Sequence, residues 1–268
     1  YQPKLKPNVR QVKEAARLIL EAKRPVIYAG GGIVASGAGA ALLRLAELTG
    51  IHVITTLMAR GVVPDDHPLC LGMPGMHGNY TAVTSMQKAD LLIALGTRFD
   101  DRVTGKLPAF ATQAKVIHAD IDPAEIGKNR NADVPIVGDA RLVIEELISA
   151  IGAEYDKGER GNYTAWTAQL DDWRRRFPYR YSQPDTGKLK PQFVISRISE
   201  LTEGNGIYVA GVGQHQMWAS QFITFRRPRT WINSGGLGAM GFGVPAAMGA
   251  KVAMKDDEVW CIDGDVCF

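Results

Sequence analysis

The chain has 268 residues, of which 46% are hydrophobic and 22% charged, and its formal net charge is +3. These values exclude a disordered chain, whose signature is few apolar residues and a high net charge. The weak positive charge is spread along the sequence, so no nucleic-acid partner is expected. No run approaches the ~18 apolar residues of a membrane-spanning helix, so no membrane partner is expected either. Cys70, Cys261 and Cys267 fit no disulfide framework and no zinc spacing, which favours reduced thiols in an intracellular protein.

Helical and apolar segments alternate through the first half of the chain. Apolar residues at helical spacing predict helices near residues 12–22, 36–49, 80–88 and 140–151. Between them, short apolar runs predict strands at 26–29, 52–57, 90–96, 116–122 and 135–139, and residues 60–78 resemble a loop. Strands without polar alternation, separated by helices, indicate a parallel sheet covered on both faces. We therefore predict a doubly wound α/β domain over residues 1–152.

The composition changes after this domain. Residues 153–188 are rich in charges, aromatics, Gly and Pro, and they predict a linker that contains one helix. The run Arg174-Arg175-Arg176 fits a solvated helix face better than a site for an anionic partner.

A second α/β unit is predicted over residues 189–268. Its expected elements are a helix around Val194–Leu201, a strand at 207–213, a small-residue helix at 244–254 and a strand at 259–262. Two strands rarely make a stable sheet, and a buried parallel strand needs helices to cover it. The sequence is therefore expected to be a fragment of a longer protein, with this second domain incomplete.

The segment Gly30-Gly31-Gly32-Ile33-Val34-Ala35 fits the glycine pattern of dinucleotide-binding turns, in which backbone amides at a helix N-terminus bind pyrophosphate. A nicotinamide site also places an acid at the end of the second strand. Here that strand ends in Thr55-Thr56-Leu57-Met58, which argues against NAD.

Charged residues follow two later strands. The segment Gly96-Thr97-Arg98-Phe99-Asp100-Asp101-Arg102 follows the third, and Asp120 and Asp122 end the fourth. Ligands of parallel sheets bind at the carboxyl ends of strands, and guanidinium groups pair with phosphate. The two aspartates are candidates to accept hydrogen bonds from an adenosine. Mutual ion pairing among these arginines and aspartates explains the same residues equally well.

Other candidates lie in glycine-rich turns. His77 in Gly75-Met76-His77-Gly78 fits an ordinary loop histidine better than a ligand contact, whereas Gln214-His215 directly follows a strand-end glycine. Met240, in a loop of mostly bare backbone, fits either support for an aromatic ring or a core contact. Asp263-Gly264-Asp265 fits either a hard cation that bridges phosphates or a plain Asp-Gly turn.

Taken together and in order, these motifs resemble the large catalytic subunit of acetohydroxyacid synthase (acetolactate synthase), a thiamine-diphosphate enzyme. The resemblance rests on the glycine turn at 30–32 and on segments 75–78, 96–105, 120–129, 211–218, 235–243 and 262–265. It implies a central FAD-binding domain (1–152), a linker (153–188) and the first part of the diphosphate-binding domain (189–268). FAD in this family is structural and redox-silent.

The resemblance also implies site residues, position by position. FAD contacts are expected at Gly30, Gly31, Gly32, Thr56, Leu57, Met58, Gly75, Met76, His77, Gly96, Thr97, Arg98, Asp100, Arg102, Val103, Asp120, Ile121 and Asp139. Thiamine diphosphate is expected to contact Val212, Gly213, Gln214, His215, Gly238 and Met240, with Met240, Gln214 and His215 in catalytic roles. Met240 is expected to hold the cofactor in a bent shape, and Asp265 is the expected Mg²⁺ ligand.

The implied reaction joins two 2-oxo acids with loss of CO2, in branched-chain amino-acid biosynthesis. Two pyruvates give 2-acetolactate, and pyruvate with 2-oxobutyrate gives 2-aceto-2-hydroxybutyrate. The full-length chain is expected to form a homodimer or tetramer, with a regulatory small subunit as a possible partner. It is expected in the cytoplasm of a bacterium, or in an organelle of a plant or fungus.

The sequence departs from the family pattern at one position, Val266, where the family has Gly. A β-branched residue resists positive φ, so the metal loop is expected to be strained there. The glutamate that activates the cofactor and a second metal ligand, an asparagine, are expected outside this sequence, so the polypeptide alone is predicted to be inactive. The alternatives are another thiamine-diphosphate enzyme, such as a glyoxylate carboligase or a pyruvate oxidase, and a non-catalytic nucleotide-binding module.

Overall fold

A computed structural model describes residues 2–268, which fold into two units. The first unit comprises residues up to 63 and 67–178, and the second comprises 64–66 and 179–268. No helix in the described part of the chain is long and apolar enough to cross a membrane, and no disulfide joins the cysteines there.

The first unit contains a parallel sheet of six strands in the order β3-β2-β1-β4-β5-β6. Its strands are β1 (Pro25–Ala29), β2 (Val53–Thr55), β3 (Cys70–Gly72), β4 (Leu91–Leu95), β5 (Lys115–Asp120) and β6 (Val134–Val137). Its helices are α1 (Val9–Glu21), α2 (Gly31–Ala35), α3 (Gly39–Thr49), α4 (Tyr80–Lys88), α5 (Asp101–Thr104), α6 (Ala140–Tyr155) and α7 (Thr164–Arg176), with 3-10 turns η1 (Leu57–Ala59) and η2 (Leu107–Ala109). The predicted doubly wound α/β domain is confirmed.

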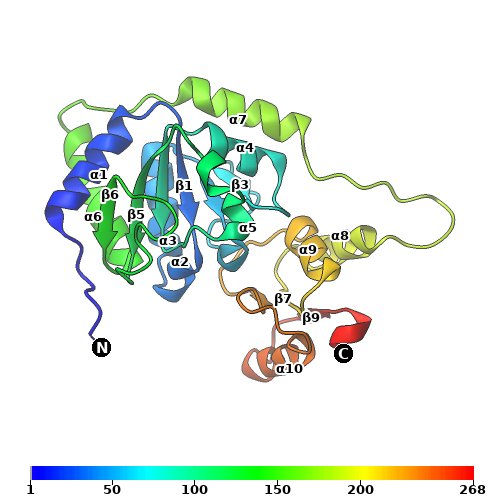
Figure 1. Cartoon of the computed structure of the whole chain (residues 1–268). Helices are drawn as coiled ribbons and strands as arrows, with labels where there is room; N and C mark the ends of the chain where they lie inside the picture. Colours follow the sequence, from blue (N-terminus) through cyan, green and yellow to red (C-terminus); the bar gives the residue numbers. More distant parts are fainter. Residues whose placement is uncertain (1) are drawn as a thin grey trace. The chain divides into compact units, whose positions relative to one another are not determined.

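Helices cover both faces of this sheet (Figure 1). Alternate residues of β1 point to opposite faces: Ile27 and Ala29 pack with α1, α3 and α6, whereas Val26 and Tyr28 pack with α4 and α7. Every residue of β1 and β4 is buried, as the unbroken apolar runs predict. Local signals set the helix ends: the Asn79 side chain caps α4 at Ala82 N, and Gly50 ends α3 at φ 71°.

Helix α7 packs onto the first unit, which therefore extends to Pro178. Residues 153–178 of the expected linker (153–188) thus belong to the first unit, and residues 179–188 belong to the second. Tyr163 donates its hydroxyl to Ile19 O at 2.6 Å, and Trp166 donates Nε1 to Pro25 O at 3.2 Å. Arg174 donates to Pro68 O and Cys70 O, both at 2.8 Å. These are long-range contacts that composition does not reveal.

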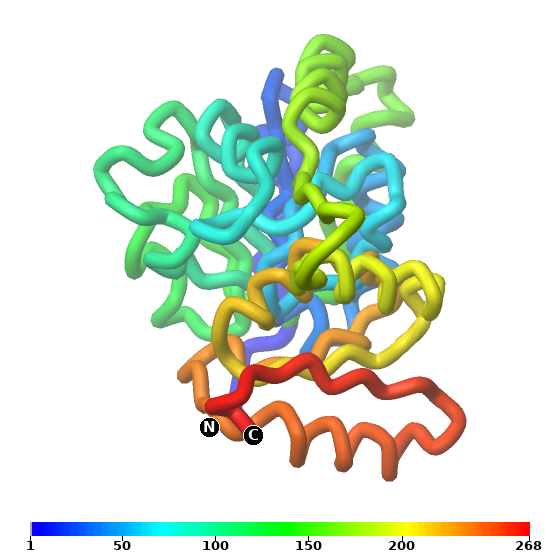
Figure 2. Tube along the Cα trace, turned by 90° about the vertical axis from the view of Figure 1, so that its right-hand side faces the viewer, coloured from blue at the N-terminus to red at the C-terminus, as the bar shows by residue number. Residues whose placement is uncertain are grey.

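The second unit contains three parallel strands in the order β8-β7-β9. The strands are β7 (Ile207–Ala210), β8 (Trp231–Asn233) and β9 (Val259–Ile262), and the helices are α8 (Pro191–Leu201), α9 (Gln214–Phe222), α10 (Gly243–Ala253) and the 3-10 turn η3 (Asp265–Cys267). The expectation of two strands was wrong, because the short β8 pairs with β7. Figure 2 shows β9 running alongside α10.

Candidate functional site

The first candidate site lies at the carboxyl edge of the six-stranded sheet. The strand order reverses between β1 and β4, which are adjacent in the sheet although three strands apart along the chain. Turns Gly30–Gly32 and Gly96–Arg102 follow these two strands directly. In open α/β sheets, ligands bind outside the carboxyl ends of the strands at this switch point, and this strand order is the one found in dinucleotide-binding sheets.

The two turns pack so closely against each other that only glycine fits at the points of contact. Gly30 N donates to Leu95 O at 3.0 Å, and Gly32 N donates to Gly96 O at 2.8 Å. A Cβ atom at Gly32 would lie 2.6 Å from the Gly96 Cα, which a real side chain cannot occupy. The glycine pattern therefore has a structural cause in addition to any ligand, and the contacts of Gly30, Gly31 and Gly32 with FAD remain a prediction.

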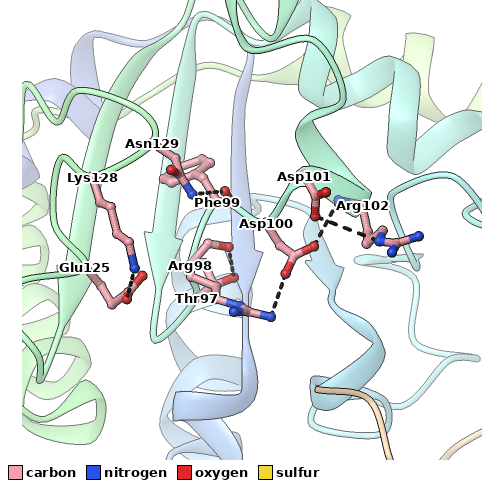
Figure 3. Close-up of polar contacts among 9 residues, drawn as sticks. All are labelled: Thr97, Arg98, Phe99, Asp100, Asp101, Arg102, Glu125, Lys128 and Asn129. Carbon is pink, nitrogen blue, oxygen red and sulfur yellow. Dashed lines mark hydrogen bonds and ion pairs between the residues drawn. The ribbon is translucent and has the colours of Figure 1, made fainter. Parts of the chain in front are cut away.

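Two arginines lie on the β4 turn with their guanidinium groups exposed. Arg98 Nη2 is 2.6 Å from Asp100 Oδ2, and Asp100 also caps α5 by accepting from Arg102 N at 2.9 Å (Figure 3). The side chain of Arg98 remains 60% exposed and that of Arg102 75% exposed. Arg102 Nε is 3.9 Å from Asp101 Oδ1. Mutual ion pairing thus exists at both arginines, as one of the two interpretations predicted, but both guanidinium groups are exposed enough to bind an anionic ligand as well.

A buried histidine fixes the backbone of this turn. Desolvation by burial lowers the pKa of His118, so its imidazole is neutral at pH 7 and donates Nε2 to Thr97 O at 2.8 Å. Asn129 also holds this turn, because it donates Nδ2 to Phe99 O at 2.7 Å (Figure 3). Sequence reasoning did not assign these roles, because both residues act on backbone atoms about 20 or more positions away.

Two further segments meet the same edge. The tight loop 75–78 lies against α5, where Met76 N donates to Arg102 O at 3.0 Å. Gly75 has φ 92°, and a Cβ there would lie 2.8 Å from Arg102 O and 3.3 Å from Val103 Cγ2. Met58, in the segment after β2, also lies close to the first turn: a Cβ atom added at Gly31 would lie 3.3 Å from the Met58 Cβ. Thr56 Oγ1 is buried and has no hydrogen-bond partner within residues 2–268. The structure thus brings four predicted segments together, and an edge of the sheet with an orphaned hydroxyl and two exposed arginines fits a polar, anionic cofactor.

Two predicted FAD contacts, Asp139 and Asp120, make other hydrogen bonds in the described structure, and a third, Ile121, is exposed. Asp139 caps α6 by accepting from Arg141 N at 3.0 Å and Leu142 N at 3.2 Å. Asp120 Oδ1 accepts from Asp122 N at 2.9 Å. Ile121 is exposed directly after β5. Capping accounts for the position of Asp139, so its contact with FAD is the least supported of the set.

The second candidate site lies within the second unit, at the carboxyl ends of β7 and β9. Val212 and Gly213 follow β7, and Gln214 and His215 begin α9. His215 Nε2 lies 3.2 Å from Asp263 Oδ1 on the turn after β9. The predicted Gly238 has φ 72°, and a Cβ there would contact Val212 Cγ1 at 3.7 Å, whereas Met240 is exposed on the same loop.

Asp263 is a buried residue of this site to which the sequence analysis assigned no role of its own. Its side chain is 10% exposed, and its Oδ2 has no hydrogen-bond partner within residues 2–268. A Cβ at Gly211 or Gly243 would collide with its carboxylate, at 2.1 and 2.4 Å. Its position directly after a predicted strand was the one signal in the sequence that could have marked Asp263 as a site residue. Its ion pair with His215 could be found only from the fold.

The predicted metal ligand Asp265 is exposed and accepts from Val266 N at 3.0 Å. Val266 lies in the 3-10 turn η3 and is absent from the positive-φ residues. The expected strain was therefore wrong, because this turn needs no left-handed residue at that position. Carboxylate oxygen suits Mg²⁺, so the exposed Asp265 fits the group expected there.

Comparisons with known proteins match both units. Residues 12–147 match the family model described as thiamine pyrophosphate enzyme, central domain, and residues 211–268 match thiamine pyrophosphate enzyme, C-terminal TPP binding domain. The whole chain is 59% identical to the acetolactate synthase of Mycobacterium leprae, and spans 43% of that protein. It is 54% identical to the acetolactate synthase large subunit of Corynebacterium glutamicum, spanning 42% of it.

A plant relative shows the same pattern. Over 98% of its length, the chain is 49% identical to acetolactate synthase 1, chloroplastic, of Zea mays, and it spans 40% of that protein. The chain thus spans less than half the length of these relatives. With matches to both domain models and to acetolactate synthases along its entire length, the chain belongs to the thiamine pyrophosphate enzymes.

Proposed function

We propose that this chain forms the FAD-binding and part of the thiamine-diphosphate-binding region of an acetolactate synthase. The proposed reaction condenses two 2-oxo acids with loss of CO2, giving 2-acetolactate from pyruvate, or 2-aceto-2-hydroxybutyrate from pyruvate and 2-oxobutyrate. The observation that carries this proposal is identity of 59% to an acetolactate synthase along the full 268 residues. Similarity of this kind, spread over both units, favours the synthase over the other thiamine-diphosphate enzymes.

FAD is the proposed ligand of the first unit. Arg98 and Arg102 would pair with its phosphates, because both guanidinium groups are exposed at the switch point of the sheet. The buried, unpaired Thr56 hydroxyl would hydrogen-bond to the flavin nucleotide. Met58 and Met76 are exposed on the neighbouring segments and offer apolar contacts to an aromatic ring. The role proposed for FAD is structural.

Thiamine diphosphate is the proposed ligand of the second unit. When bound, it supplies the carbanion chemistry that decarboxylates a 2-oxo acid and transfers the remaining two-carbon unit. Gln214 and His215 would bind and orient its diphosphate, and the exposed Met240 would support the ring system. Asp265 would hold the Mg²⁺ that neutralises the diphosphate.

The partners of the whole protein are part of the same proposal. We propose 2-oxo acids as substrates, a homodimer or tetramer of the longer polypeptide, and a regulatory small subunit. A bacterial cytoplasm is the proposed location, because the mycobacterial relative at 59% identity exceeds the plant relative at 49%.

A graft tests the activity. The matching segment of the Mycobacterium leprae acetolactate synthase is replaced by residues 1–268, and acetolactate formation from pyruvate is measured colorimetrically. We expect turnover that requires thiamine diphosphate, Mg²⁺ and FAD, and none from the isolated 268-residue chain. A folded graft that binds FAD but forms no acetolactate would overturn the proposed reaction.

A second experiment separates FAD from NAD. Flavin fluorescence and calorimetry on the 268-residue chain are expected to show binding of FAD and none of NAD. Arg98→Gln should weaken FAD binding about tenfold or more, because a charge-assisted phosphate contact is worth roughly 1.5–3 kcal/mol. Arg175→Gln, an exposed arginine on α7, is the matched control and should leave the affinity unchanged. Binding of NAD instead would support a nucleotide-binding module.

A further inference from the structure

The turn that carries Arg98 is held by its backbone on both sides of that residue. On the N-terminal side, Thr97 O accepts from His118 Nε2 at 2.8 Å. On the C-terminal side, Phe99 O accepts from Asn129 Nδ2 at 2.7 Å (Figure 3). The two donors come from β5 and from the loop between β5 and β6. The backbone of Arg98 is therefore fixed by two side chains that lie outside its own turn.

The register of the sheet places His118 next to this turn. Tyr28 on β1, Ala94 on β4 and His118 on β5 are partners in register, so their side chains form one row on one face. The Phe99 ring contacts both ends of the row, with its centroid 5.8 Å from that of Tyr28 and 5.2 Å from that of His118. Because the middle residue is alanine, the row has room for this ring between its outer members. All four side chains are buried, so the turn is anchored by the Phe99 ring as well as by its carbonyl groups.

The hydrogen bond to Thr97 O determines which ring nitrogen of His118 carries the proton. A carbonyl oxygen only accepts, so the proton is assigned to Nε2, and Nδ1 carries none. Nδ1 is buried and has no hydrogen-bond partner among residues 2–268. A second proton would lie there without an acceptor, and burial accordingly lowers the pKa of His118, although the charges of Asp120 and Glu125 act in the opposite direction. The ring is therefore neutral, and its one N–H is bonded to the turn.

The same turn determines where two guanidinium groups lie. Arg98 Nη2 is 2.6 Å from Asp100 Oδ2, and Asp100 Oδ1 accepts from Arg102 N at 2.9 Å at the start of α5. A shift of the backbone at Thr97 or Phe99 would therefore move Arg98 and, through Asp100, also Arg102. Donors that are already in place bind a ligand more tightly, because ordering them during binding costs free energy.

We propose that His118 is a positioning residue for FAD binding, which acts by donating its ring N–H to Thr97 O. This bond holds the turn 96–102 in the form that presents Arg98 and Arg102 to the phosphates of FAD. This role rests on the proposed function, because FAD is the ligand proposed for the first unit. Without the donor, Thr97 O would belong to a buried residue and have no partner, so the turn would shift or open toward water.

Two substitutions at His118 separate the hydrogen bond from the volume of the side chain. His118→Gln keeps an N–H donor near the position of Nε2, whereas His118→Leu fills much of the same space and donates nothing. FAD affinity is measured by flavin fluorescence and calorimetry on the 268-residue chain. We expect His118→Leu to weaken FAD binding about tenfold or more, and His118→Gln to remain within about threefold of the unmodified chain, because only the leucine leaves a buried acceptor without a donor.

His52→Leu is the matched control, because His52 is a second buried histidine of the same sheet. It lies directly before β2, at the amino end of the strands, and should leave FAD affinity unchanged. Equal weakening by His118→Leu and His52→Leu would show a general loss of stability and overturn the positioning role. Equal FAD binding by His118→Leu and the unmodified chain would overturn this inference alone, whereas an unmodified chain that binds no FAD would overturn the proposed function.

Nitrogen-15 NMR of labelled histidines tests the same hydrogen bond without a variant, and so applies even where His118→Leu fails to fold. In the unmodified chain, the imidazole that contacts the Phe99 ring should be the Nε2–H tautomer at pH 7. Its N–H should exchange with solvent about tenfold more slowly when FAD is present at roughly ten times its Kd. An Nδ1–H tautomer, or an exchange rate that bound FAD does not change, would overturn the proposal.

Discussion

The two units differ in how deeply their apolar strands and helices are buried. In the first, unbroken apolar runs become strands buried on both faces, with one core against α1, α3 and α6 and another against α4 and α7. In the second, the apolar strand β9 is partly exposed, and α10 leaves Met248 67% exposed. Apolar sequence therefore predicts secondary structure in both units, but burial only where helices cover both faces of the sheet.

The first prediction concerns the closure between β1 and β4, where the largest effect is expected. Gly32→Ala places a Cβ 2.6 Å from Gly96 Cα, and backbone cannot yield as a flexible side chain does. We expect a loss of about 3 kcal/mol or more in the free energy of unfolding of the first unit, measured by urea denaturation.

Gly152→Ala is the matched control for this change. It lies in α6 with nothing within 4 Å of its Cβ position, and should stabilise by about 0.5–1 kcal/mol. Equal effects of the two substitutions would show that the turns are not tightly packed.

The second prediction concerns acid. Burial, reinforced by Arg174, lowers the pKa of His52 from 6.5 to about 4. Because the folded pKa lies below the unfolded value, the unfolded state takes up the proton first, and stability is complete above about pH 6.5 and lost as the pH falls toward 4. We expect a loss of about 3 kcal/mol across this window.

Hydrogen exchange measures this loss in the first unit separately from the second. His52→Gln should flatten the pH dependence of exchange in β1 and β2. An unchanged slope in that variant would contradict the assignment to His52.

The third prediction concerns the edge strand β3. Arg174→Ala removes two charge-assisted hydrogen bonds to Pro68 O and Cys70 O, so exchange protection of β3 should fall by about 2 kcal/mol. Arg175→Ala, whose partner Asp172 is 3.7 Å away in an exposed pair, should change protection by less than about 0.5 kcal/mol. Equal effects would mean that α7 does not hold β3.

The smallest effect is expected on α10. Met248→Gln should change the free energy of unfolding of the second unit by less than about 0.5 kcal/mol, because this side chain is mostly exposed. By contrast, Leu147→Gln in α6 places a polar group in a fully buried position of the first unit and should cost several kcal/mol. A large loss for Met248→Gln would show that the exposed face of α10 is covered in solution.

The sequence predicted elements that have an apolar pattern of their own, and it missed strands that only their hydrogen bonds to a neighbouring strand define. Helix 80–88 and strand 259–262 match α4 and β9 to the residue. Strands β3 and β8 have three residues each, and their hydrogen bonds to β2 and β7 define them rather than any local pattern. For the same reason, the long-range bonds of α7 were not predictable from composition.

The candidate sites likewise had parts that the sequence predicted and parts that it did not. Its turns were predictable because ligands of parallel sheets bind at strand ends, and the structure brings segments 30–32, 75–78 and 96–103 together. The supporting contacts from His118 and Asn129, and the pairing of His215 with Asp263, were not predictable, because they join residues distant in sequence. The prediction of strain at Val266 was wrong, because the sequence pattern alone does not determine which type of turn the backbone adopts.

The central claim is that the carboxyl edge of the six-stranded sheet binds FAD, and hydrogen exchange with and without FAD tests it most directly. The account predicts slower exchange at residues 30–32, 56–58, 75–77 and 96–103, with the amides of α6 beyond its first turn unchanged. Unchanged exchange at these four segments with FAD in excess, or protection confined to the second unit, would contradict it.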